Sequence, residues 1–195
     1  MQVGSADKNR RERILSSALE CFNESGVPAT SIGAICSRSG ASVGSVYHFF
    51  GSKDGIAAAL YAEGLNSNLD HLERALETVT GAEQGIRAIV ESLVQWIAAH
   101  RDWARFIYVA SLGWCADDDT TAAVNARYAT VIGTYFKPYL EAAELRELPR
   151  ECWSSLVVGP VHDYARRWLS GQVSVDITHH ADVFASAAWN AVRRL

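Results

Sequence analysis

TSIGAICSRSGASVGSVYHFFGSK, residues 30–53, is the stretch that decides the fold of this chain. Its residues predict two short helices with a tight turn between them. The first helix, residues 31–38, has apolar residues on one face at helical spacing, at Ile32, Ile35 and Cys36. Gly40 then stops this helix at a position where the backbone needs a positive φ, and Ser42 follows as the N-cap of a second helix.

The second predicted helix has an inward and an outward face. Val46 and Phe50 stand four residues apart and point inward. The outward face presents mostly short or polar side chains, at Val43, Gly44, Ser45, Tyr47 and His48. Two helices of this size and spacing are typical of a helix-turn-helix, whose second helix enters the major groove of DNA.

The same stretch resembles the DNA-binding domain of the TetR family of transcriptional regulators. Matching residues stand at the family's offsets, namely Thr30, Ser31, Ile32, Ile35, Gly40, Ser42, Gly44, Tyr47, Phe50, Lys53, Asp54 and Ile56. The departures at Cys36, Ser39 and Ala41 are mild changes. Phe49 stands where the family usually has His or Tyr, so a polar phosphate contact is missing there.

Length and composition indicate a globular protein of one or two domains. With 195 residues, 49% of them apolar and 21% charged, the chain can bury a sizeable core. Four prolines and little strand-like alternation favour an all-helical fold. The chain has no apolar run long enough for a transmembrane helix, and residues 1–13 lack the apolar centre of a secretory signal. We therefore expect a cytoplasmic protein.

The charge distribution and the cysteine content indicate which partners the chain can bind. The net charge is −4, yet residues 1–55 carry +1 and the remainder −5, so a local basic patch can hold a duplex while an acidic body faces away. Basic residues crowd the start of the first helix, and we interpret them as an arm that approaches phosphates, at Lys8, Arg10, Arg11 and Arg13. The four cysteines form no CxxC pair, so we read them as reduced thiols and predict no metal site and no cofactor.

Apolar periodicity predicts nine helices. The first covers residues 8–25 and ends at Gly26 and Pro28; the sixth follows Asp102 and carries apolar residues as far as Trp114. The eighth is bent at Gly159-Pro160. A long fourth helix, apolar from Ile56 to Leu76, joins two domains.

The predicted fold is therefore all-α, with an N-terminal three-helix helix-turn-helix domain joined by a long helix to a C-terminal helical domain. We place the DNA-binding domain at residues 1–54 and an effector-binding and dimerisation domain at residues 55–195.

Hydroxyl groups, cations and short side chains around the motif form the predicted DNA contact. Thr30 and Ser31 stand at a helix N-terminus, which favours a phosphate, and the resemblance places Tyr47 and Lys53 on the DNA backbone. The whole predicted set is Thr30, Ser31, Ser42, Val43, Gly44, Ser45, Tyr47, His48 and Lys53. Direct readout of bases is sparse in this set, although Val43 can meet a thymine methyl.

The resemblance also implies a small effector bound among the helices of the second domain, and a homodimer formed through its last two helices. Our candidates for effector contact are Trp103, Phe106, Trp114, Tyr128, Tyr135 and His162. Each of them is also explained as an ordinary core residue. On this reading the protein is a repressor that a small apolar effector releases from a palindromic operator.

Two alternatives belong to other classes. The second domain could serve only to dimerise a DNA-binding protein that has no effector. A cysteine-dependent enzyme, with Cys115 and His162 in a nucleophilic triad, is the other, but the spacing of these residues carries no catalytic signature, and we predict that the chain is not an enzyme.

Overall fold

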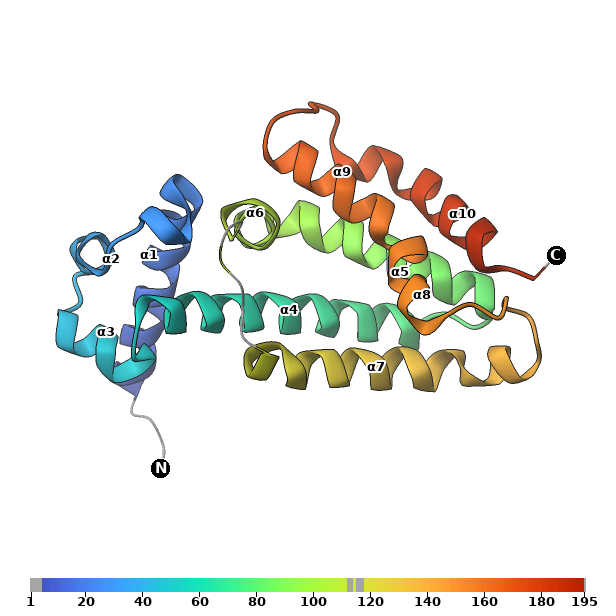
Figure 1. Cartoon of the computed structure of the whole chain (residues 1–195), viewed down its shortest axis with the longest axis horizontal. Coiled ribbons are helices and arrows are strands. Elements are labelled where there is room, and N and C mark those ends of the chain that lie inside the picture. Colours follow the sequence, from blue (N-terminus) through green and yellow to red (C-terminus); the bar gives the residue numbers. More distant parts are fainter. Residues whose placement is uncertain (1–4, 112–113, 115–117, 195) are drawn as a thin grey trace. The chain divides into compact units, whose positions relative to one another are not determined.

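The computed structural model describes residues 5–111, 114 and 118–194, and within these ranges the chain forms ten α-helices, two short helical turns and no β-strand (Figure 1). The prediction of an all-α fold is confirmed. The elements are α1 (Ser5–Ala29), α2 (Ile32–Ser39), α3 (Val43–Phe50), α4 (Lys53–Glu77), α5 (Ala82–Ala99), α6 (Arg101–Arg105), η1 (Phe106–Ala110), α7 (Asp118–Glu141), α8 (Arg150–Val157), α9 (Gly159–Leu169), η2 (Ile177–His180) and α10 (Ala181–Val192).

Contacts between residues divide the chain into two compact units. The first contains the described residues up to Gly64 and those between Asp102 and Ala122, and the second contains the rest. The division falls inside α4, whose first half belongs to one unit and whose second half belongs to the other. The helix-turn-helix is therefore part of a larger unit that also includes α6 and η1.

The core of the first unit joins these distant segments. Fully buried side chains come from all of its main helices, including Ile14 and Phe22 of α1, Ile35, Val46, Leu60 and Phe106. The rings of Phe22 and Phe106 are stacked, with centroids 5.8 Å apart. A Cβ atom on Gly64 would lie 2.8 Å from Cδ1 of Ile107 and 3.0 Å from Cε3 of Trp103, so a side chain at this position of α4 would force these two side chains to move.

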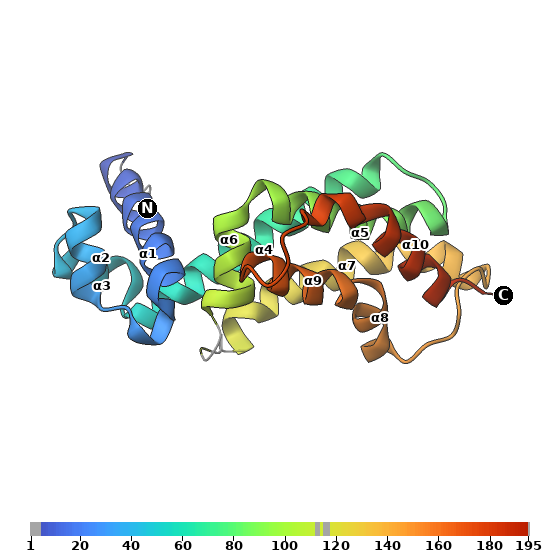
Figure 2. The ribbon, with the colours of Figure 1, turned by 90° about the horizontal axis from the view of Figure 1, so that it is seen from above.

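The second unit is organised around α5. This helix buries most of its side chains and packs against α10, which lies alongside it in Figures 1 and 2, and also against α8, α9 and η2. Arg87 of α5 fixes α10, because its guanidinium lies 2.9 Å from the carboxylate of Asp182 and 3.0 Å from the hydroxyl of Ser186. Trp96 is fully buried and donates from Nε1 to Ser67 of α4 over 3.1 Å.

Three predicted helices differ in detail from the structure. The sixth is shorter, because α6 continues as the π-helical turn η1, which ends at Ala110, and Trp114 lies outside both. The predicted bend at Gly159-Pro160 is a break that separates α8 from α9, and Pro160 occupies the first turn of α9, where a missing N–H costs nothing. The ninth helix is preceded by η2, which Asp176 caps by accepting from the N–H of Thr178 over 2.9 Å.

Candidate nucleic-acid interface

Local caps shape the helix-turn-helix as the sequence predicts. The Ser31 hydroxyl accepts from the N–H of Ala34 and the Ser42 hydroxyl from that of Ser45, each over 3.1 Å. Gly40 has a φ of 67° and donates its N–H to the carbonyl of Cys36 over 2.9 Å. These bonds satisfy backbone groups that helix ends leave free, and the left-handed conformation at Gly40 is one that glycine adopts without strain.

Arg13 adds a long-range contact to the turn, 26 residues away in sequence. Its Nη2 atom donates to the carbonyl of Ser39, the last residue of α2. The same Nη2 atom would lie 3.2 Å from a Cβ atom on Gly40. The sequence predicts that Arg13 is part of an arm that approaches phosphates. In the structure, Arg13 instead holds the turn between α2 and α3 against α1. Sequence reasoning had no signal for this role, since it depends on how α1 packs.

The recognition helix α3 has two distinct faces. Val46 is fully buried and Phe50 partly buried against the core of the first unit. Val43 and Tyr47 are 50% and 52% exposed, and His48 is exposed beside them. The structure thus brings the outward-facing residues of the motif together on one solvent-facing surface.

Ser45 and Gly44 contribute less to this surface. Ser45 is half-buried, and its hydroxyl lies 3.0 Å from that of Ser42, so the two hydroxyls bind each other. Gly44 is exposed and has no side chain to present. Most of the side-chain area that α3 offers to a partner therefore comes from Val43, Tyr47 and His48.

Thr30 and Lys53 make internal contacts. Thr30 is 5% exposed, and its hydroxyl donates to the carbonyls of Gly26 and Cys21 over 2.8 and 3.2 Å. Lys53 is half-buried, and its ammonium donates to the carbonyls of Pro28 and Thr30, each over 2.9 Å. Both side chains fix the segment that leads into α2. These internal contacts leave Thr30 with no free hydroxyl proton, and leave Lys53 with one N–H for the predicted phosphate contact.

Two arginines near the motif are paired with carboxylates. Arg11 lies 2.8 Å from Glu63, with its guanidinium over the ring of Phe50. Arg38 of α2 binds Glu24 through two nitrogens, over 2.8 and 2.9 Å. These two hydrogen bonds lower the pKa of the Glu24 carboxyl and raise that of the Arg38 guanidinium. Such exposed pairs orient α2 on α1 more than they stabilise the fold.

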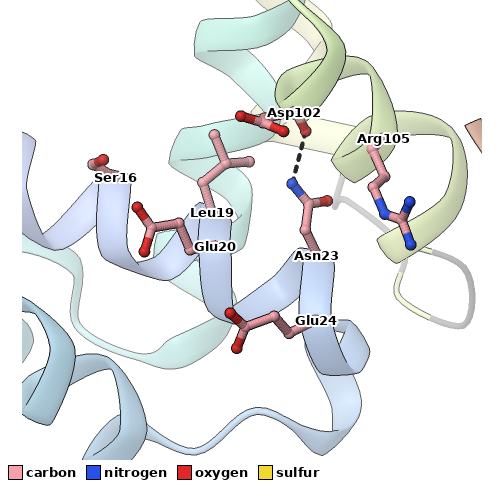
Figure 3. A pocket seen from close by; sticks show the side chains of 7 residues that line it. All are labelled: Ser16, Leu19, Glu20, Asn23, Glu24, Asp102 and Arg105. Atoms are coloured by element: carbon pink, nitrogen blue, oxygen red, sulfur yellow. Dashed lines mark hydrogen bonds between the residues drawn. The ribbon is translucent and has the colours of Figure 1, made fainter.

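A cleft of about 490 Å³ lies between α1 and α6 of the first unit (Figure 3). Its lining is mostly polar and consists of Ser16, Leu19, Glu20, Asn23, Glu24, Asp102 and Arg105. Asn23 of α1 bridges to α6 by donating to the Asp102 carbonyl over 2.9 Å, the dashed line in Figure 3. None of the residues predicted to contact an effector lines this cleft.

The six predicted effector residues are divided between the two units. Trp103, Phe106 and Trp114 belong to the first, where Phe106 is fully buried in the core and the two tryptophans pack against it. Tyr128, Tyr135 and His162 belong to the second. Phe106 is thus a core residue of the unit that carries the helix-turn-helix. This is the alternative to effector contact that the sequence allowed for each of the six residues.

The second unit holds a polar cluster between α4 and α7. Arg127 binds Glu73 and lies 2.7 Å from Asp70, while the hydroxyl of Tyr128 donates to Asn68. The Nδ2 atom of Asn68 is buried and meets no acceptor among the described residues. Burial raises the pKa of Tyr128, so this phenol stays a hydrogen-bond donor. Sequence reasoning selected Tyr128 but missed the four α4 and α7 residues around it, because charges three apart on a helix, such as Asp70 and Glu73, usually indicate a solvated face.

Tyr135 and His162 are also partly buried. Tyr135 donates to the carbonyl of Gly81 over 3.1 Å, and burial raises its pKa. Burial, and then the nearby charge of Arg166, lower the pKa of His162. Cys115, the nucleophile of the alternative enzymatic reading, lies outside the described residues.

Within the residues that the structure describes, no three His, Cys, Asp or Glu side chains are placed to share a metal ion. No helix in those ranges combines the length and apolarity needed to cross a bilayer.

Comparison with known proteins places the motif in a family. Residues 14–60 match the model of the family described as bacterial regulatory proteins, tetR family. The HTH-type transcriptional regulators BetI of Burkholderia cenocepacia (strain HI2424) and Burkholderia orbicola (strain MC0-3) are each 36% identical over 50 residues, which is 26% of this chain and 26% of theirs. The match thus spans about a quarter of the length of these relatives.

Solved structures extend the likeness to the whole fold. A TetR family transcription regulator from Marinobacter aquaeolei VT8 superposes with a TM-score of 0.81 at 18% identity, covering 97% of this chain and 98% of that one. The fatty acid degradation regulator FadR from Bacillus halodurans gives 0.79 at 15% identity, covering 96% of both chains. FadR from Bacillus subtilis, solved in complex with stearoyl-CoA, gives 0.77 at 14% identity, over 91% of this chain and 96% of that one.

The capped helix-turn-helix and the surrounding all-α architecture define the class, a helix-turn-helix regulatory protein. Within that class, residues 14–60 match the TetR family model, and the fold of the chain is similar to that of a TetR family transcription regulator.

Proposed function

We propose that this protein is a transcriptional regulator that binds a palindromic operator as a homodimer and is released by a small apolar effector. The observation that carries the proposal is the solvent-facing surface of α3, which presents Val43, Tyr47 and His48. Ser42 caps the start of this helix, and the inner face of the helix is buried. A helix held in this way is suited to the major groove. On this proposal the protein acts in the cytoplasm, and as a regulator rather than as an enzyme.

DNA binding is divided between backbone and base contacts. Ser31 and Ser42 lie exposed at the N-termini of α2 and α3, where helix dipoles favour phosphates, and Tyr47 can donate to a phosphate from the adjacent turn. Lys53 has one N–H left for a phosphate after its two carbonyl contacts. Because Thr30 is buried, we assign it the support of this surface rather than contact with DNA.

The dimer is proposed to form through α8, α9 and α10. Large apolar side chains remain exposed there in the single chain, with Leu156 at 38% and Val183 at 64%. A two-fold dimer needs such a self-complementary surface. Its two recognition helices would then read half-sites about 34–36 Å apart, or a multiple of that spacing.

The effector is proposed to bind the second unit and to be aromatic or acyl-bearing. Support comes from its partly buried aromatic and polar groups, Tyr128, Tyr135 and His162. The likeness in fold to FadR from Bacillus subtilis, solved with stearoyl-CoA, makes an acyl thioester a sensible first ligand to test. Since α4 contributes to both units, a ligand against its second half can alter the first unit only if it binds the DNA-incompetent state more tightly.

Footprinting on the DNA that flanks the protein's own gene tests the proposal. We expect protection of a palindromic site, and a dimer in analytical ultracentrifugation. Tyr47→Ala should weaken binding to all sequences alike with an unchanged salt dependence, whereas Lys53→Ala should also reduce the salt slope by about 0.9 if its last N–H neutralises a phosphate. The proposal is refuted if the protein binds DNA without any sequence preference at every salt concentration.

Linkage tests the effector separately. A true effector changes operator affinity by about 5- to 150-fold, and saturating operator must change effector affinity by the same factor. Titrations of acyl thioesters followed by tryptophan fluorescence, with and without operator, supply both numbers. A ligand that binds equally well in both cases is not an effector, and failure of every ligand class would leave the second unit as a dimerisation unit alone.

A further inference from the structure

The chemistry of α3 restricts which bases it can recognise. Val43–Phe50 contains no Arg, Lys, Asn or Gln. The usual specific contacts in the major groove are bidentate, from Arg or Lys to guanine and from Asn or Gln to adenine. The exposed surface of α3 therefore cannot make either kind of contact.

Helix α2 does not supply them instead. Of its exposed residues other than Arg38, Gly33 and Ala34 have little or no side chain, and Ser37 has a single hydroxyl, which cannot make a bidentate contact like that of a guanidinium or an amide. Arg38 is its one guanidinium, and Glu24 occupies both of its terminal nitrogens. Base recognition by this helix-turn-helix must then rest mainly on contacts other than bidentate hydrogen bonds.

Val43 is placed for such a contact. It is the first residue of α3, directly after the Ser42 cap, and half of its surface is exposed although it is a large aliphatic residue. Its neighbours do not compete for space, because Gly44 has no side chain and the Ser45 hydroxyl is turned to Ser42. The first residues of a recognition helix are those that face base edges.

Among the four bases only thymine presents a methyl group in the major groove. We infer that Val43 packs against the 5-methyl group of a thymine and that each operator half-site carries thymine at that position. This inference rests on the proposed function and specifies its substrate, an operator read chiefly through an apolar contact.

Replacement of thymine by deoxyuridine removes the methyl group and leaves the base pairing unchanged. The operator is first selected from random DNA with the full-length chain, and each thymine of the selected site is then replaced in turn. Burial of one methyl group predicts about fourfold weaker binding for uracil at the Val43 position in one half-site, and about 15-fold when both half-sites are changed.

The Val43→Ala variant isolates the contact. Because Val43 is exposed, the variant should keep the thermal stability of the wild type. Its shorter side chain should lose most of the contact, so uracil at that position should weaken its binding clearly less than it weakens binding by the wild type. Val175→Ala is the matched control, since Val175 is similarly exposed at 47% but lies in the second unit, and it should keep the full preference for thymine.

Two outcomes are distinguishable. If the wild type selects a sequence but shows no loss on uracil substitution, or the same loss in Val43→Ala, the methyl contact is refuted while DNA binding stands. If no sequence is selected, the proposed function itself fails, and this inference fails with it.

Discussion

Phe106→Ala should weaken the DNA-binding unit, although Phe106 lies more than fifty residues beyond the helix-turn-helix in sequence. The side chain is fully buried and stacks on Phe22 of α1. Removing a buried phenylalanine costs about 3–5 kcal/mol, of which the ring pair accounts for about 0.5–1.5 kcal/mol. Operator affinity should fall as well, because α1 carries the contacts that hold the turn before α3.

Native-state hydrogen exchange measures this locally. A loss of about 3–5 kcal/mol should lower the protection of α1 amides by roughly two to four orders of magnitude. Phe136→Ala is the matched control, because Phe136 is 4% exposed and packs beside Tyr135 in the second unit. We expect it to lower protection in α5 and α7 first. The reasoning is refuted if Phe106→Ala leaves α1 protection intact and instead loosens α5.

Three other changes probe separate features. Gly40→Ala should destabilise the fold by about 1–2 kcal/mol, because φ is 67° at this C-cap of α2. Gly33→Ala inside α2 should raise the melting temperature, because a Cβ atom there makes only an ordinary contact, 3.8 Å from Oγ of Ser31. Val183→Glu should yield a monomer in analytical ultracentrifugation, and a persistent dimer would place the interface elsewhere. The pKa of His162 is lowered in the folded state, so unfolding takes up a proton and the free energy of unfolding should fall as pH drops below about 6.5. His162→Gln should make the free energy of unfolding less dependent on pH in this range. An unchanged pH dependence would exclude His162 as the cause of the fall.

The sequence determined the features whose cause lies within a few residues. The caps at Ser31 and Ser42 and the stop at Gly40 each depend on a side chain and a backbone group at most four residues apart, so they are readable from spacing. The inner and outer faces of α3 follow from helical periodicity in the same way. This is why the helix-turn-helix, the all-α class and the family could be predicted before any coordinates.

Only the tertiary structure decided what these faces pack against. Periodicity marks Phe106 as apolar, but its stacking on Phe22 depends on where α6 and η1 are docked, which assigns this segment to the first unit. Arg13 and Lys53 read as free cations in sequence, yet each binds backbone carbonyls more than twenty residues away. A side chain's partner is fixed by helix packing geometry rather than by its own neighbours in sequence, so the roles of these residues depend on the fold as a whole.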